Sequence, residues 1–215
     1  MFMPRTGDYS LYLVTDAELI GTRDLLSCVR AAIAGGVSMV QLREKNRTAR
    51  EFYHLAQTVR ETTSALDVPL IINDRLDIAL AMNADGVHLG QNDLPAGVAR
   101  HLLGAGKIMG ISAATMPEAV AAARQGASYV GVGAVFPTTT KGNVRAVTLA
   151  QLAAIKQVLA IPVLAIGGIT VHNAPEVLRT GVDGICVAKA ILGEENIIQA
   201  ASQLRKLLPH KEELI

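Results

Sequence analysis

Aromatic side chains are scarce in this chain of 215 residues, which has four tyrosines, three phenylalanines and no tryptophan. A protein that stacks nucleic-acid bases needs aromatic platforms, and one that grips the phosphate backbone usually carries a basic face or arm. The 20 basic and 19 acidic residues are instead interspersed and leave a formal net charge of +1. We therefore expect no nucleic-acid partner.

Cysteines and long apolar runs are also lacking. Cys28 and Cys186 are the only thiols, and two cysteines without a metal-binding spacing indicate reduced, structural residues in a reducing compartment. No apolar run approaches the ~20 residues that span a bilayer. The first ten residues lack the basic and then apolar segments of a secretory signal. We expect a cytoplasmic protein without a membrane partner.

Short apolar, β-branched runs, by contrast, recur along the whole chain. They lie at 11–14, 37–42, 70–72, 86–89, 108–111, 129–132, 163–166 and 185–187. Each run is almost continuously apolar, which is typical of parallel strands covered on both faces, and helical patterns lie between them. Two of these helices should begin with capping boxes, Thr48 with Glu51 and Thr115 with Glu118.

This alternation predicts an α/β protein, a single-domain (β/α)8 TIM barrel over residues 1–215 with its core at about 10–208. Eight strands, seven interposed helices and one terminal helix are expected. An open, doubly wound sheet is the competing layout. It would carry a glycine-rich dinucleotide loop after the first strand, and the segment LYLVTDAEL has none.

Function in such a barrel gathers in the loops that follow the strands, and polar residues are dense at these positions. Asp74 and Asp93 follow neighbouring strands, so their carboxylates can converge on one ion. An all-oxygen site suits Mg²⁺, which takes one or two carboxylates together with substrate phosphate oxygens. The alternative makes Asp74 a helix cap and Asp93 a turn residue.

Cations and glycines at the same rim point to anionic ligands. Arg43 and Lys45 share one side of the extended chain with Gln41, and Lys141 follows the sixth strand. Gly167 and Gly168 follow the seventh strand, where barrels often bind phosphate through backbone N–H groups. His88 lies within a strand. We favour a buried histidine with satisfied hydrogen bonds, and general acid–base work is the alternative.

Taken in order, six motifs resemble the thiamine phosphate synthase family. They are VQLREK (40–45), INDRLDIAL (72–80), ADGVHLGQND (84–93), GIS (110–112), GAVFPTTTK (133–141) and AIGGIT (165–170). The resemblance implies a transferase that joins hydroxymethylpyrimidine diphosphate to a thiazole phosphate, or to its carboxylated form, and releases pyrophosphate. It implies Mg²⁺ as the cofactor.

The resemblance also implies roles for individual residues. The metal would bind Asp74 and Asp93. The pyrimidine diphosphate would contact Gln41, Arg43, Lys45, Asn73, Ser112 and Lys141, among which Arg43, Lys45, Ser112 and Lys141 would be catalytic. Leu42 and Glu44, within the same motif, would also bind substrate. The thiazole phosphate would contact Thr138, Thr139, Thr140, Gly168, Ala188 and Lys189.

The family's mechanism is dissociative: the carbon–oxygen bond to the diphosphate breaks first, and the thiazole nitrogen then attacks the pyrimidine cation. Two alternatives are a related thiazole tautomerase and a non-catalytic phosphate-binding barrel. The tautomerase relies on a histidine after the fifth strand, where this chain has Ala114, and a mere binder need not keep a metal site. Members often form dimers, so a homodimer is expected. Lys189 departs from the family, which commonly has a serine there.

Overall fold

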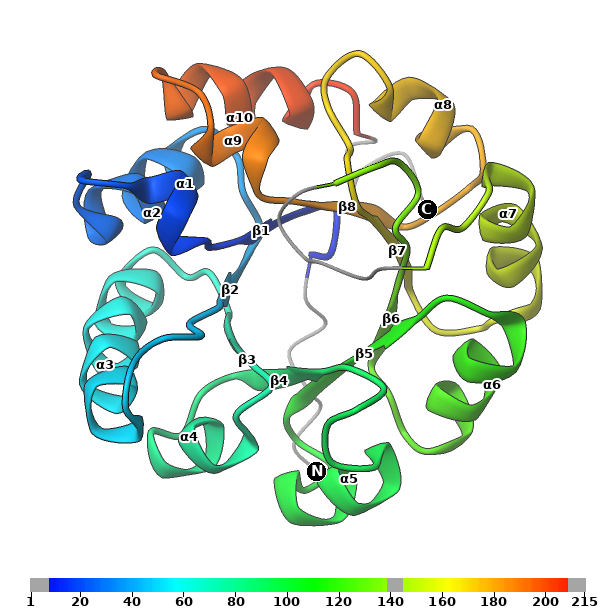
Figure 1. Ribbon diagram of the computed structural model, residues 1–215, viewed down its shortest axis with the longest axis horizontal. Helices are drawn as coiled ribbons and strands as arrows, with labels where there is room; N and C mark the ends of the chain where they lie inside the picture. The colour runs from blue at the N-terminus through cyan, green and yellow to red at the C-terminus, as the bar shows by residue number, and fades with distance from the viewer. Residues whose placement is uncertain (1–7, 139–144, 209–215) are drawn as a thin grey trace.

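The computed structural model describes residues 8–138 and 145–208. Within them, eight parallel strands pair in chain order, and β8 returns to pair with β1, so the sheet closes into a barrel. Figure 1 shows the ring of strands at the centre and the helices around it. This arrangement confirms the predicted (β/α)8 TIM barrel of the α/β class and excludes the open sheet.

The strands are short and buried, as the continuous apolar runs predict. They are β1 (Leu11–Val14), β2 (Met39–Leu42), β3 (Leu70–Asn73), β4 (Gly86–Leu89), β5 (Ile108–Ala113), β6 (Tyr129–Val132), β7 (Val163–Ile166) and β8 (Gly184–Val187). The second strand starts later than predicted because its pairing with β1 begins at Met39. The fifth strand extends to Ala113, which pairs with Val132.

The helices are α1 (Ala17–Ile20), α2 (Leu25–Ala34), α3 (Ala49–Ala65), α4 (Leu76–Ala81), α5 (Ala96–Leu103), α6 (Met116–Arg124), α7 (Leu149–Val158), α8 (Ala174–Leu178), α9 (Lys189–Leu192) and α10 (Ile197–Arg205). The predicted number of eight helices was too low, because α1 and α9 were not predicted. Each has four residues, too few to show the apolar periodicity by which a helix is recognised in a sequence.

Helix starts are set by side chains that accept hydrogen bonds from free backbone N–H groups. The box of Thr48 and Glu51 is complete, as predicted. At α6 only half of the predicted box forms: Thr115 accepts from the Glu118 backbone, but the Glu118 carboxylate accepts from Ala114 N at 2.8 Å instead. The other oxygen of the same carboxylate pairs with Arg145.

Two apolar layers hold the barrel together. The outer layer fills the space between strands and helices and includes Leu13, Leu42 and Phe52. The inner layer lies inside the barrel and contains Tyr12, Val14, Met39, Ile71, Ile108, Tyr129, Leu164 and Cys186. Burial raises the pKa of the Cys186 thiol, and Cys28 is buried as well, so both cysteines are packing residues, as expected.

Among residues 8–138 and 145–208, no helix combines the length and the apolar character that crossing a bilayer requires. The predicted extent of the domain, residues 1–215 with a core at about 10–208, stays a prediction.

Candidate active site

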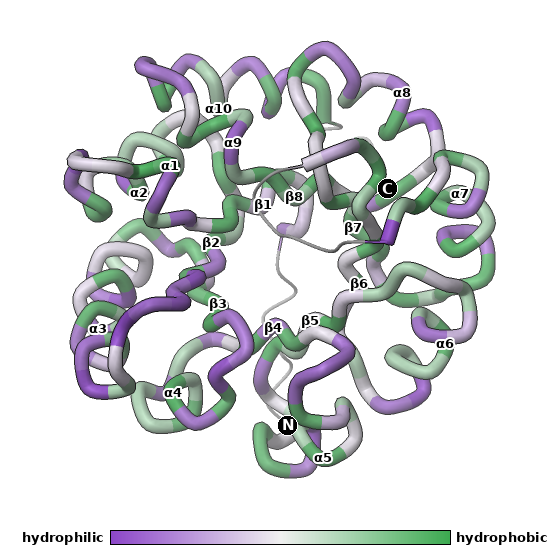
Figure 2. Tube along the Cα trace, in the orientation of Figure 1, coloured by the Kyte–Doolittle hydropathy of each residue, from purple (hydrophilic) through white to green (hydrophobic). Residues whose placement is uncertain are grey.

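The end of β2 sends alternate side chains to opposite sides of the barrel wall. Gln41 is buried inside the barrel, where its Nε2 donates to the Tyr12 hydroxyl at 3.0 Å. Leu42 points outward into the helix-facing layer, so only its backbone is available to a ligand at the barrel mouth. Figure 2 shows the hydrophilic segment that leads from β2 to α3. The alternation of the strand therefore separates Gln41 from Leu42, and the predicted shared side of Gln41, Arg43 and Lys45 stays a prediction.

Arg43 is held by the loop that follows β1. Its Nη1 donates to Asp16 Oδ2 at 2.9 Å, and its backbone N donates to Thr15 Oγ1 at 3.0 Å. The other oxygen of Asp16 accepts from the Glu18 and Leu19 backbones and so caps α1. Asp16 thus fixes a helix start and an arginine together. The sequence places Thr15 and Asp16 at a strand end, but it does not indicate that they position Arg43.

We expect Asp16→Asn to impair activity through Arg43. The asparagine oxygen can still cap α1, but an amide NH₂ would face the guanidinium, so Arg43 loses its orienting partner. Stability should fall by about 2 kcal/mol, the scale of a hydrogen bond between charged groups. Activity should fall by about tenfold, the equivalent of a further 1.4 kcal/mol in transition-state stabilisation. Thermal unfolding and steady-state kinetics measure the two effects.

Asp24→Asn is the matched control, because Asp24 also caps a helix through its side chain but lies beside exposed residues of α2. It should lose little stability and no activity. An Asp16→Asn variant with unchanged activity would mean that Arg43 does not depend on Asp16.

Lys45, Asp74 and Asp93 form a compact charged cluster at the rim. The Lys45 ammonium contacts the Asp74 carboxylate. Asp74 has a φ of +60°, a left-handed conformation that aspartate tolerates better than most residues. Its backbone N donates to His88 O at 2.8 Å, which docks the end of β3 on β4. The predicted meeting of the two aspartates from neighbouring strands is supported by the effect of the Asp74 carboxyl on the pKa of Asp93.

Burial raises the pKa of Asp93, and the nearby Asp74 carboxyl raises it further, while the Gly90 N–H and Lys45 act in the opposite direction. The two carboxyls are therefore close enough to repel each other when both are ionised. Among the described residues no group of three or more His, Cys, Asp or Glu side chains gathers around a common point. The candidate is accordingly a two-carboxylate, all-oxygen site.

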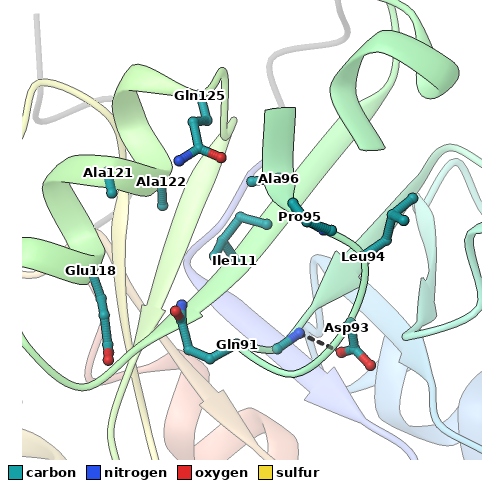
Figure 3. Close-up of a pocket in the computed structure, with 11 residues that line it drawn as sticks. Gln91, Asp93, Leu94, Pro95, Ala96, Ile111, Glu118, Ala121, Ala122 and Gln125 are labelled. Atoms are coloured by element: carbon teal, nitrogen blue, oxygen red, sulfur yellow. Dashed lines mark hydrogen bonds between the residues drawn. The ribbon is translucent and has the colours of Figure 1, made fainter. Parts of the chain in front are cut away.

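The loop after β4 bends Asp93 back onto its own backbone. Its Oδ2 accepts from Gly90 N at 2.6 Å, the contact dashed in Figure 3. Beside it lies a cavity of about 230 Å³ between α5 and α6, lined by Leu94, Pro95, Ile111, Glu118 and Gln125 among others. This cavity lies outside the barrel, away from Arg43 and Lys45, so we place the site at the barrel mouth instead.

Glu44 has a local structural role. Its Oε1 accepts from the backbones of Lys45 and Asn46, and its Oε2 accepts from Arg47 Nε at 3.1 Å. Its side chain is only 8% exposed. Glu44 thus shapes the loop that carries Lys45, and its predicted contact with substrate stays a prediction.

Asn73 and Ser112 lie near the ends of β3 and β5, and Asn73 is buried. His88 pairs with Asn73 across β3 and β4, and its Nε2 lies 2.9 Å from Ser112 Oγ. Its Nδ1 lies 2.9 Å from the Tyr129 hydroxyl. This confirms the favoured interpretation of His88 as a buried histidine with satisfied hydrogen bonds. Sequence reasoning missed Tyr12 and Tyr129, which in the sequence look like ordinary apolar strand residues.

The loops after β6 and β7 lie against each other. Phe136 N donates to Gly167 O at 3.1 Å, and Val135 N donates to Ile166 O at 3.0 Å. Gly168 has a φ of +62°, and a Cβ there would meet Pro137 O at 2.5 Å. Only glycine therefore fits this close approach of two loops.

The remaining predicted residues flank these loops. Thr138 is partly buried, Ala188 directly follows β8, and Lys189 is an exposed first residue of α9. Thr139, Thr140 and Lys141 lie outside the described residues.

A closed parallel barrel with its polar side chains gathered at the C-terminal strand ends is the architecture of a TIM-barrel enzyme. Residues 11–191 match the family model described as thiamine monophosphate synthase. The chain therefore belongs to the thiamine monophosphate synthase family, and it is a transferase.

Curated relatives and a solved structure agree. The thiamine-phosphate synthase of Alkaliphilus oremlandii is 50% identical over 200 residues, which cover 93% of this chain and 96% of that protein. The one of Clostridium acetobutylicum is 52% identical over 190 residues, 88% and 90% of the two chains. The thiamine phosphate pyrophosphorylase structure from Pyrococcus furiosus has a TM-score of 0.86 at 41% identity and covers 94% of this chain and 96% of that one. These names support the synthase over the tautomerase and the non-catalytic barrel.

Proposed function

We propose that this transferase uses Mg²⁺ to join hydroxymethylpyrimidine diphosphate to a thiazole phosphate, giving thiamine phosphate and pyrophosphate. The observation that carries the proposal is the cluster of Lys45, Asp74 and Asp93 at the C-terminal strand ends, together with Arg43, which lies two residues before Lys45 after β2. Two cations next to two facing carboxylates suit a metal–diphosphate complex, because the carboxylates need a cation and the diphosphate needs positive charge.

The residues present fit the metal. Asp74 and Asp93 offer only oxygen ligands, and burial together with the neighbouring Asp74 carboxyl raises the pKa of Asp93 although Lys45 acts against the rise. A further positive charge beside the pair would stabilise its ionised form. A magnesium ion bound there would neutralise charge on the diphosphate. Asp74 and Asp93 would hold the ion, and Lys45, now paired with Asp74, would be free to turn toward the phosphate oxygens.

The protein's own residues then stabilise the departing group. The carbon–oxygen bond to the diphosphate breaks with both electrons leaving on oxygen, and the thiazole nitrogen supplies the pair that forms the new carbon–nitrogen bond. The negative charge on the pyrophosphate develops as the bond breaks, and it is stabilised by Arg43, Lys45 and Lys141. Gln41, Asn73 and Ser112 orient the pyrimidine. No protein nucleophile is needed.

The second substrate is assigned to the opposite side of the mouth. Gly168, with its positive φ, lets the loops after β6 and β7 approach closely, and backbone N–H groups of the loop after β7 would bind the phosphate. The same phosphate site would include Thr138, Thr139 and Thr140 after β6, and Ala188 and Lys189 after β8. The two phosphate-bearing substrates would thus meet over the barrel axis.

The test is an assay of purified protein with both substrates, following thiamine phosphate and pyrophosphate in parallel. We expect equal amounts of both products, loss of activity in excess chelator, and recovery when Mg²⁺ is restored. Turnover that persists in chelator would refute the metal. A tautomerase would instead interconvert the thiazole alone and release no pyrophosphate.

Two further predictions accompany this function. We propose that the chain forms a homodimer, which sedimentation equilibrium of the purified protein would test. We also propose that it works in the cytoplasm, where cell fractionation should place it.

A further inference from the structure

A continuous line of hydrogen bonds crosses the interior of the barrel beneath the proposed site. Its members come from five strands, and each link is 2.9 or 3.0 Å long. In order they are Gln41 Nε2 to Tyr12 Oη, Tyr12 Oη to Tyr129 Oη, Tyr129 Oη to His88 Nδ1, and His88 Nε2 to Ser112 Oγ. We call these five residues the interior relay. Its two ends are residues assigned to the pyrimidine diphosphate, and its three middle members have no assigned role.

The relay is sealed from solvent at its centre. Tyr12 and Tyr129 are both 0% exposed, and burial raises the pKa of each hydroxyl well above its ordinary value. Their rings meet edge to face with centroids 5.8 Å apart. Each hydroxyl is therefore a neutral group that both donates and accepts one hydrogen bond at a fixed place.

The barrel wall leaves room for this arrangement. A Cβ at Gly110 of β5 would lie 2.1 Å from Tyr129 Cζ and 2.5 Å from His88 Nδ1. One at Gly131 of β6 would lie 3.2 Å from His88 Cε1. Glycine at 110 thus makes the contact between Tyr129 and His88 sterically possible.

The direction of the relay follows from counting protons. Gln41 Nε2 donates a hydrogen bond to the Tyr12 hydroxyl. The Tyr12 hydroxyl therefore donates its own hydrogen bond to the Tyr129 hydroxyl, which in turn donates to His88 Nδ1. A neutral imidazole that accepts at Nδ1 carries its hydrogen on Nε2, and it donates that hydrogen to Ser112 Oγ. The Ser112 hydroxyl, already accepting, keeps its proton for an acceptor beyond the relay.

We propose that Tyr12, Tyr129 and His88 are positioning residues that hold His88 as the Nε2–H tautomer and thereby present the Ser112 hydroxyl as a hydrogen-bond donor to an anionic substrate group at the barrel mouth. This inference rests on the proposed function for the identity of that group. The same relay uses one N–H of the Gln41 amide nitrogen on Tyr12, which directs the other N–H and the Gln41 oxygen to remaining partners. Removal of the central hydroxyls should impair catalysis while the barrel stays folded.

The first test reads the histidine tautomer directly in the substrate-free protein. Nitrogen-15 NMR of histidine-labelled protein distinguishes a protonated from an unprotonated ring nitrogen, and a His88→Gln spectrum assigns the signals. We expect an Nε2–H tautomer in the unmodified chain and a change toward Nδ1–H in Tyr129→Phe. A wild-type Nδ1–H tautomer, or a spectrum unchanged in Tyr129→Phe, would overturn the proposal. Because no substrate is needed, this result stands even if the proposed reaction is wrong.

The second test is a double-mutant cycle with Tyr129→Phe and Ser112→Ala. Tyr129→Phe alone should lower kcat roughly three- to tenfold, the factor that one hydrogen bond of ordinary net strength supports, with little change in KM for the thiazole phosphate. If the relay acts through Ser112, the double variant should be no slower than Ser112→Ala alone, because coupled residues are not additive. Additive losses would contradict action through Ser112.

Tyr53→Phe is the matched control. Tyr53 lies on α3 and its hydroxyl accepts from Gln57 Nε2 at 3.1 Å on the outer surface, so its loss should leave both kcat and the His88 spectrum unchanged. Tyr12→Phe provides a second relay variant. It should reproduce the direction of the Tyr129→Phe effects, and normal kinetics together with a normal spectrum would count against the relay.

Discussion

Replacing Asp93 by asparagine should abolish most activity and at the same time make the substrate-free protein more stable. Asp93 is partly buried beside the Asp74 carboxyl, and burial followed by this neighbour raises its pKa. Its charge is therefore unfavourable in the folded protein when no metal is bound. Asparagine removes the charge and can still accept from Gly90 N through its oxygen, so the loop after β4 should keep its shape.

The pH dependence of the stability gain follows from the direction of the pKa shift. A carboxyl whose folded-state pKa lies above the ordinary value of 3.8 binds more protons folded than unfolded, so its contribution to stability falls as the pH rises through that window. Below the ordinary value both states are protonated and Asp93 imposes no penalty. Asp93→Asn should thus raise Tm most near neutral pH, and the gain should vanish in acid.

The loss of activity should be about two orders of magnitude, the scale of losing one preorganised group that stabilises transition-state charge. Kinetics across a range of Mg²⁺ concentrations, together with thermal unfolding from acid to neutral pH, would measure both effects. Asp183→Asn is the control, because Asp183 precedes β8 at the opposite rim, where it accepts from Val163 N and pairs with Lys156. It should retain activity. A fully active Asp93→Asn variant would show that Asp93 is not a metal ligand.

Gly110→Ala should strongly destabilise the protein, because the added methyl group would enter the packed interior of the barrel. The new Cβ would lie 2.1 Å from Tyr129 Cζ and 2.2 Å from its hydroxyl oxygen, and Tyr129 is fully buried between Tyr9, Tyr12 and His88. Overpacking of this kind costs about 3 kcal/mol. For a chain of this size that cost lowers Tm by roughly 6–12 °C.

Gly106→Ala is the matched control, since a Cβ there meets nothing within 4 Å and the backbone is not in the left-handed region. Its effect on stability should stay within about 0.5 kcal/mol, as for an ordinary surface position. Differential scanning calorimetry of both variants beside the unmodified protein measures the contrast. Equal melting temperatures for the two variants would show that the barrel interior can repack around the extra carbon.

The sequence allowed the fold to be predicted because every strand of a closed parallel sheet is covered on both faces. The continuous apolar runs, such as Val163–Ile166, record that double burial, and the alternation with helices leaves few topologies. The same logic predicted the rim residues, since all parallel strands end at one edge. Helices α1 and α9 were missed because four residues carry no periodic pattern.

For the candidate site, chain order alone was enough to predict which chemical groups gather there: two aspartates after neighbouring strands, Arg43 and Lys45 two residues apart, and glycines after β7. These positions are set by chain order and by the twofold alternation of a strand. The partners of these side chains could not be predicted, because they come together only when the barrel closes. Asp16 orients Arg43 from 27 residues away, and Tyr12 meets Tyr129 from 117 residues away. Tyr12 and Tyr129 could not be recognised as polar site residues from the sequence, because both lie in apolar strands and their hydroxyl groups bind each other only in the closed barrel.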